Sequence, residues 1–254
     1  MPILKFLFLL LLVSVCTKTF AGDTRPLLVL TGDNSALKEK ITPESQPYSP
    51  EFVDKMLTDA GMRGVFESQP LARALMTLAS RDDAMLYALA RTPEREARYR
   101  WIGVLAERSY YFYGLRSRKD LSIKSLPDAM RHRIGVVRKD ARAEYLRAKG
   151  FPVGKDAGLQ EVNYGTLNIQ KILKDRIDLL VYSPEGLKRA CAEAAVACDQ
   201  FTPLFKLDLS VSLWLVASPL MPEPLFEDLK RAHQKQMDSG YLPKLMKSGR
   251  AAGY

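Results

Sequence analysis

The chain has 254 residues, of which 47% are hydrophobic and 26% are charged, and its formal net charge is +9. This composition indicates a globular protein. Lys and Arg alternate with Asp and Glu and form no basic stripe with interleaved aromatic residues, so we expect no nucleic-acid partner. The charge then belongs to a solvated surface, or to a basic cleft that attracts anionic solutes.

The first 21 residues carry the pattern of a secretory signal peptide. Lys5 precedes an apolar run over residues 6–15, and Thr19 begins a small-residue cleavage site that ends at Ala21. This run is too short to cross the ~30 Å hydrocarbon core of a bilayer. We expect cleavage after Ala21 and a periplasmic mature protein. Cys16 offers a lipid anchor as an alternative, although the bulky residue before it argues against one.

Two cysteines, Cys191 and Cys198, remain after such processing. An even number of cysteines in an oxidising compartment favours a disulfide, with free thiols as the alternative. The chain has only two histidines, His132 and His233, and neither lies near the cysteine pair in sequence. We therefore expect no metal and no cofactor.

Apolar runs and helical periodicities alternate along the rest of the chain. We expect strands at 27–31, 65–67, 84–89, 109–115, 133–137, 160–163, 178–182 and 207–217. We expect helices at 50–60, 71–78, 141–149, 166–174, 184–195, 225–237 and 242–247, and a short one after Ser125. Alternation of this kind predicts an α/β fold with a largely parallel sheet. The polar stretch 33–47 predicts a loop at the carboxyl end of the first strand, where open α/β sheets bind ligands.

Five segments follow one another with suggestive spacing. They are residues 69–105, with Thr92-Pro93-Glu94-Arg95 inside, Ser125-Leu126-Pro127-Asp128, Arg133-Ile134-Gly135-Val136, Lys174-Asp175-Arg176-Ile177-Asp178 and Met237-Asp238-Ser239-Gly240-Tyr241. In this order they resemble the bacterial family 3 solute-binding proteins, the amino-acid-binding receptors of ABC importers. The resemblance implies the two-lobed type 2 periplasmic-binding-protein fold, in which each lobe is a mostly parallel sheet flanked by helices and two hinge strands join the lobes. It places lobe 1 at 22–114 and 208–254 and lobe 2 at 115–207.

The resemblance implies that Arg95, which closes the Thr-x-x-Arg motif, grips the carboxylate of the ligand. The chemistry is suitable, because a guanidinium is planar, stays charged and matches a carboxylate with two parallel hydrogen bonds. The backbone N–H of Thr92, at the start of a helix, would add attraction for an anion. The alternative is a surface ion pair between Arg95 and an acid such as Glu94 or Glu96.

Further residues of the cleft are expected at the strand ends and helix starts of both lobes. These candidates are Tyr48, Tyr87, Ala90, Arg91, Arg138, Tyr182 and Ser183. The two tyrosines Tyr48 and Tyr87 would serve equally well as core residues. Arg138 stands before a predicted helix, which suggests a second acidic group on the solute, or a solvent-exposed charge. Ser183 replaces the aspartate that commonly receives a ligand's ammonium in this family, so the resemblance does not assure a free α-amino acid as ligand.

The function implied is that of a periplasmic receptor for a small-molecule ligand with a carboxylate, an amino acid or a related compound. Such a receptor, expected to be a monomer and not an enzyme, hands its solute to an inner-membrane ABC permease or to a sensor domain. One alternative is a periplasmic lyase or dehydratase on the same fold, which would need a titratable acid or base in the cleft. Another is a degenerate receptor that acts as a signalling partner, which the altered positions Ala88, Ala90 and Ser183 keep open.

Overall fold

The computed structural model of the protein describes residues 25–32, 48–154 and 156–247. The strands are β1 (Leu27–Thr31), β2 (Gly64–Ser68), β3 (Ala84–Ala90), β4 (Arg100–Leu115), β5 (Arg133–Val137), β6 (Gly158–Val162), β7 (Leu179–Tyr182) and β8 (Phe201–Ala217). The helices are α1 (Tyr48–Asp59), α2 (Leu71–Ser80), α3 (Pro93–Glu96), α4 (Leu126–Met130), α5 (Ala141–Ala148), α6 (Thr166–Leu173), α7 (Pro184–Glu193), the 3₁₀ turn η2 (Cys198–Gln200), α8 (Glu223–Asp238) and α9 (Tyr241–Lys247). The predicted alternation of strands and helices is confirmed.

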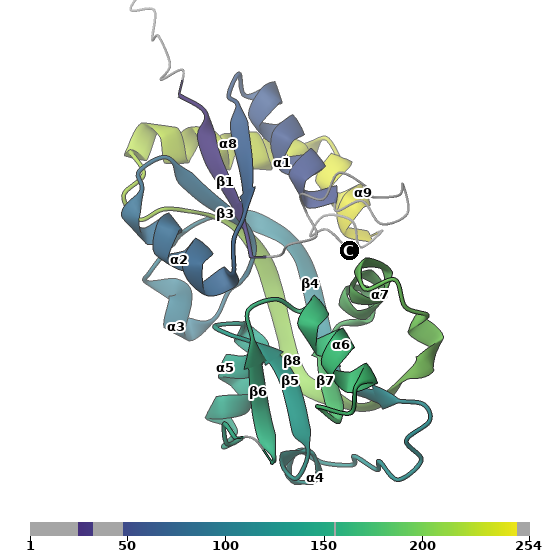
Figure 1. Cartoon of the computed structure of the whole chain (residues 1–254). Helices are drawn as coiled ribbons and strands as arrows, with labels where there is room; N and C mark the ends of the chain where they lie inside the picture. The colour runs from purple at the N-terminus through teal and green to yellow at the C-terminus, as the bar shows by residue number, and fades with distance from the viewer. Residues whose placement is uncertain (1–24, 33–47, 155, 248–254) are drawn as a thin grey trace, which may run out of the picture.

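Eight strands form one sheet in the order β2-β1-β3-β8-β4-β7-β5-β6. β1 pairs in parallel with β2 and β3, and β5 pairs in parallel with β6 and β7. The long strands β4 and β8 pair with each other and with both parallel groups in antiparallel fashion, and Figure 1 shows them running from one group to the other. We call β1–β3 with α1–α3, α8 and α9 lobe 1, and β5–β7 with α4–α7 lobe 2. The residue boundaries at 114 and 208 stay a prediction.

The two connecting strands are longer than the sequence pattern predicts. β4 begins at Arg100 rather than at Ser109, and β8 begins at Phe201 rather than at Leu207. Their pairing changes register at four points, for example between Trp101 and Gly103. Each such irregularity shifts the side chains that follow to the other face, so the two-residue alternation that marks a strand in sequence is broken.

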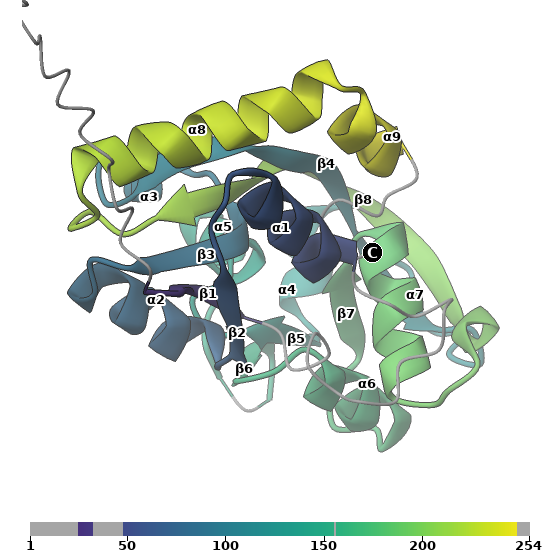
Figure 2. The ribbon, with the colours of Figure 1, turned by 90° about the horizontal axis from the view of Figure 1, so that it is seen from above.

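Helices cover both faces of the sheet in each lobe. In lobe 1, α1, α8 and α9 pack on one face around Phe52 and Leu229, and α2 packs on the other around Leu78 (Figure 2). In lobe 2, α4 and α5 pack on one face around Leu146, while α6 and α7 pack on the other around Ile172. Each lobe therefore has an apolar core of its own on either side of the sheet.

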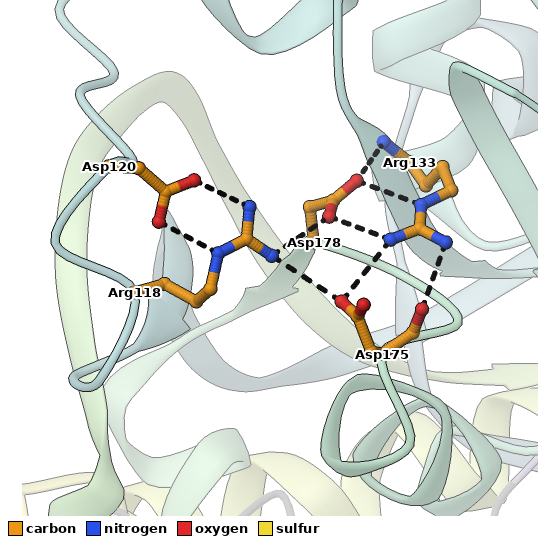
Figure 3. Close-up of polar contacts among 5 residues, drawn as sticks. All are labelled: Arg118, Asp120, Arg133, Asp175 and Asp178. Carbon is orange, nitrogen blue, oxygen red and sulfur yellow. Dashed lines mark hydrogen bonds and ion pairs between the residues drawn. The ribbon is translucent and has the colours of Figure 1, made fainter.

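A charged network closes the end of lobe 2 where β5 and β7 begin (Figure 3). The Asp178 carboxylate accepts hydrogen bonds from the backbone N–H of Arg133, from the Arg133 guanidinium at 2.9–3.0 Å and from Arg118. Arg118 also forms a two-bond pair with Asp120. Burial alone would raise the pKa of Asp178, but these bonds outweigh burial and lower it to about 2. Asp178 thus holds β5 and β7 together at the end opposite their carboxyl ends.

The predicted disulfide between Cys191 and Cys198 is confirmed, with 5.4 Å between the Cα atoms. It ties the end of α7 to the turn η2. The expected signal peptide at 1–21 and the loop at 33–47 lie outside the described residues.

None of the helices in the described part of the chain is long and apolar enough to cross a membrane. Within the same residues no group of His, Cys, Asp and Glu side chains is arranged to hold a metal ion.

Candidate functional site

A pocket of about 120 Å³ lies between the two lobes. Lobe 1 contributes residues from the carboxyl ends of β1 and β3 and from α3, and lobe 2 contributes residues that follow β5 and β7 together with the start of α6. Its polar and aromatic lining consists of Thr31, Tyr87, Arg95, Tyr110, Asp140, Arg142, Thr166, Tyr182, Ser183, Arg189 and Glu193. Pockets for drug-sized ligands typically measure ~300–1,000 Å³. The described walls therefore enclose space for a small solute only.

Arg95 reaches from lobe 1 into lobe 2. Its Nη1 donates a hydrogen bond to the Ala90 carbonyl at 3.0 Å, within lobe 1. Its Nη2 donates one to the Lys139 carbonyl at 2.7 Å and one to the Glu144 carboxylate at 2.9 Å, both in lobe 2. The Arg95 side chain is only 5% exposed, so this ion pair is largely shielded from water. The acid that pairs with Arg95 belongs to α5, not to its own turn.

These bonds restrict how the Arg95 guanidinium can hold another carboxylate. A guanidinium has five N–H donors and grips a carboxylate with two parallel bonds along either its Nε/Nη2 edge or its Nη1/Nη2 edge. Both edges include Nη2, whose two hydrogens already serve Lys139 and Glu144. A solute carboxylate can therefore be gripped by two bonds only after one of these protein acceptors releases Nη2.

Two residues at or near the pocket have left-handed backbone. Ala88 of β3 has φ 60°, at the point where the pairing of β3 with β8 changes register. Lys139, which presents its carbonyl to Arg95, has φ 61°. Non-glycine residues rarely adopt this conformation, which costs about 1–2 kcal/mol. Strained backbone of this kind concentrates at ligand sites.

A second arginine, Arg142, forms the wall of the pocket on the lobe 2 side. It holds Asp140 by two bonds of 2.7 and 2.9 Å, and donates another to the Val181 carbonyl at 2.7 Å. Its guanidinium lies 5.6 Å from the ring centroid of Tyr110 and 5.2 Å from that of Tyr182. Burial alone would raise the pKa of Asp140, but the adjacent Arg142 charge outweighs burial and lowers the pKa. Asp140 is therefore ionised at neutral pH and forms an ion pair with Arg142.

The third arginine of the pocket, Arg189, lies 3.5 Å from the Glu193 carboxylate on the same helix, α7. Each arginine in the described pocket lining thus has a carboxylate of the protein beside it. The site offers paired charges and is not a free cluster of cations. A solute acid must therefore compete with an internal acid.

Five of the predicted site residues line this pocket. Besides Arg95, they are Tyr87, Ala90, Tyr182 and Ser183. The Tyr182 hydroxyl donates to the Gly165 carbonyl at 2.9 Å. The Ser183 hydroxyl accepts from the backbone N–H of Gly186 at 3.0 Å and caps α7. Ser183 stands where the related family commonly has an aspartate that receives a ligand's ammonium, and here it stabilises the start of α7.

The structure does not bring three other candidates to the pocket lining. Arg91 pairs with Glu96, and its guanidinium lies 5.0 and 4.4 Å from the ring centroids of Trp101 and Trp214. Arg138 lies 3.5 Å from the carboxylate of Glu161 on β6. Both guanidinium groups are drawn to an acid outside the cleft.

Thr92 is the third of these candidates, and it precedes α3, a helix of four residues. A single turn has too small a dipole to support the expected anion attraction. Tyr48 begins α1, but its side chain lies outside the described residues.

Sequence reasoning missed six charged or aromatic groups of the site, namely Tyr110, Asp140, Arg142, Glu144, Arg189 and Glu193. Tyr110 stands in an aromatic run that indicated only a buried strand. Arg142 follows the helix cap Asp140 by two residues, and that spacing was the one available signal for the pair. Nothing in the sequence around Glu144 or Arg189 distinguishes them from the other charges on exposed helix faces.

Comparison with known proteins supports this architecture. No protein-family model matches the chain, and no curated relative matches it. Among solved structures, a histidine kinase sensor domain with similarity to periplasmic binding proteins superposes with a TM-score of 0.73 at 14% identity, covering 88% of this chain and 95% of that one. An ancestral arginine-binding protein bound to arginine gives 0.72 at 13% identity, covering 89% and 98%.

An arginine-, lysine-, histidine-binding protein from Geobacillus stearothermophilus gives a TM-score of 0.72 at 15% identity, covering 88% of this chain and 94% of that one. Identities this low bear on the fold alone. With the sheet order and the pocket between two lobes, they establish that the chain has the two-lobed type 2 periplasmic-binding-protein fold.

Proposed function

We propose that the chain is an exported solute-binding protein whose cleft captures a small solute with a carboxylate group. The observation that carries this proposal is the position of Arg95, buried at the wall of a pocket between two lobes. Arg142 and Arg189 are the other two arginines of the lining, and each of the three arginines is paired with an acid, Glu144, Asp140 or Glu193. A cleft with both signs of charge suits a dipolar solute, or an acid that takes the place of one of these carboxylates.

The proposed role is binding and not catalysis. A general acid or base works best with a pKa near the ambient pH. The pKa of Asp140 is lowered, away from that range, and the described residues that line the pocket include no histidine. In the periplasm, such a receptor would pass its solute to an ABC permease or report it to a sensor domain, by analogy with the proteins that share its fold.

A second candidate is a receptor that no longer depends on a solute and serves as a protein partner. The observation in its favour is that both two-donor edges of Arg95 are already engaged by Lys139 and Glu144. Resemblance to a histidine kinase sensor domain is compatible with this role. In that case the lobes would stay together without any ligand.

Thermal unfolding with a defined panel of solutes separates the two candidates. The panel is acetate, lactate, succinate, L-glutamate and L-arginine, each paired with the amide that replaces its carboxylate by an uncharged group. The solute-binding proposal expects at least one acid, and not its amide, to raise the melting temperature of the wild-type protein, and Arg95→Ala to abolish the rise. No stabilisation by any acid at millimolar concentration favours the ligand-independent partner.

A further inference from the structure

We propose that Glu144 is a built-in carboxylate that occupies the ligand clamp of Arg95 and holds the two lobes together when no solute is bound. A solute acid then binds by displacing Glu144. The displacement step rests on the proposed solute-binding function, whereas the contact between the lobes does not.

The contact has the placement that a latch requires. Arg95 belongs to α3 in lobe 1, and Glu144 belongs to α5 in lobe 2, 49 residues later. Arg95 is anchored on its own side by the Ala90 carbonyl, so its guanidinium is fixed to lobe 1 while Nη2 points at lobe 2. Hinge bending along β4 and β8 would therefore have to break two charge-assisted hydrogen bonds at once.

The backbone strain at Lys139 also supports a latch between the lobes. The carbonyl of Lys139 reaches Arg95 through a backbone turn at φ 61°, a conformation that this residue type avoids. Such strain persists only where surrounding contacts over-determine it. The bond from Arg95 is one such contact, and it crosses from lobe 1 to lobe 2.

Glu144 is also suited to being displaced. Its side chain is 28% exposed, against 5% for Arg95. A released Glu144 can therefore regain hydration at the surface, while the Arg95 charge would stay buried and needs a replacement acid. The solute carboxylate and Glu144 are thus alternative partners for the Arg95 guanidinium. Glu144 joins the lobes directly, whereas a solute would join them by contacting both.

A distance measurement between the lobes tests the latch in the absence of solute. Met76 on α2 and Val153 after α5 are 74% and 61% exposed, so spin labels at M76C and V153C report lobe separation while the Cys191–Cys198 disulfide stays intact. We expect Glu144→Gln to shift the distance distribution of the ligand-free protein to longer values. The matched control is Glu96→Gln, which removes an acid from the Arg91 pair within lobe 1 and should leave the distribution unchanged.

An unchanged distribution in Glu144→Gln, or an equal shift in the Glu96→Gln control, would overturn the latch. Affinity for the most stabilising acid of the panel tests the displacement step separately. We expect Glu144→Gln to bind it about tenfold more tightly, because the lost charge-assisted bond no longer competes. If Glu144→Gln opens the lobes but neither protein binds any acid, the latch stands and the proposed solute-binding function fails.

Discussion

Arg95 and Glu144 form a 2.9 Å hydrogen-bonded ion pair that joins lobe 1 to lobe 2 at the candidate site, whose lining includes Arg95. The pair is largely removed from water, so its attraction must offset the loss of hydration of both groups. The carbonyls of Ala90 and Lys139 help to offset this loss of hydration by accepting two further hydrogen bonds from the Arg95 guanidinium. Stability and closure of the cleft are therefore coupled through one side chain.

Replacement of Arg95 by Ala should lower the free energy of unfolding by about 2–3 kcal/mol, because three hydrogen bonds to a buried charged group are lost. Urea unfolding followed by circular dichroism measures this. The control is Arg81→Ala, which removes an exposed pair with Asp83 and should cost at most about 1 kcal/mol. Equal losses in the two variants would mean that the Arg95 contacts contribute no more than a surface pair.

Ala88→Gly should stabilise the protein by about 0.5–1 kcal/mol in spite of the lost methyl group. At φ 60° glycine avoids the clash that Ala88 pays for in the left-handed region. Ala84→Gly, in the same strand and without positive φ, is the control and should destabilise by about 1 kcal/mol or more. Melting temperatures of the two variants should therefore move in opposite directions, and a fall in both would argue against strain at Ala88.

Acid should weaken lobe 2 through Asp178. The pKa of this carboxyl is lowered to about 2 in the folded protein from an ordinary value of 3.8. A lowered pKa contributes stability that is present above pH ~4 and is lost as the pH falls toward 2, here about 2 kcal/mol.

Asp178→Asn should remove this acid-sensitive part of the stability, so the variant loses less stability between pH 5 and pH 2 than the wild type does. Asp120→Asn serves as a control, because Asp120 is 63% exposed and pairs with Arg118 only at the edge of the same network. Chemical unfolding at a series of pH values gives the slopes, and parallel curves for wild type and Asp178→Asn would contradict the assignment.

Reduction of the Cys191–Cys198 disulfide should lower the free energy of unfolding by about 2 kcal/mol, because the bond closes a short loop in the unfolded chain. Urea titrations with and without dithiothreitol measure the difference. A Cys191→Ala/Cys198→Ala variant should show no effect of the reductant. A loss of stability on adding dithiothreitol that persists in this variant would mean that the reductant does not act through the Cys191–Cys198 disulfide.

The sequence was sufficient for the order of the elements and for the presence of Arg95 in the cleft. A short apolar run placed β5, which is buried over four of its five residues, and helical spacing placed α2, which buries Ala74 and Leu78. For β4 and β8 the pattern found residues 109–115 and 207–217 but not the first part of either strand, because register shifts interrupt the alternation. Local pattern thus predicts regular elements and shortens the bulged strands that join the lobes.

The occupied state of Arg95 was beyond the reach of sequence reasoning. The sequence allowed a pair with Glu94, Glu96 or another acid but did not single out Glu144, which comes close to Arg95 only through the packing of two lobes. The placement of Arg91 is a related case, since its position near Trp101 and Trp214 depends on β4 and β8 lying side by side. Contacts between residues that are far apart in the sequence leave no local spacing pattern from which they could be predicted.

Native mass spectrometry of the protein, purified without denaturation, shows whether Arg95 holds a solute acid. We expect the wild-type protein to carry a small acidic molecule as a discrete mass increment, and Arg95→Ala, expressed and purified in parallel, to lack it. A wild-type protein with no such increment, which also fails to gain one when acids of the panel are added, would contradict this expectation. So would an increment that Arg95→Ala retains.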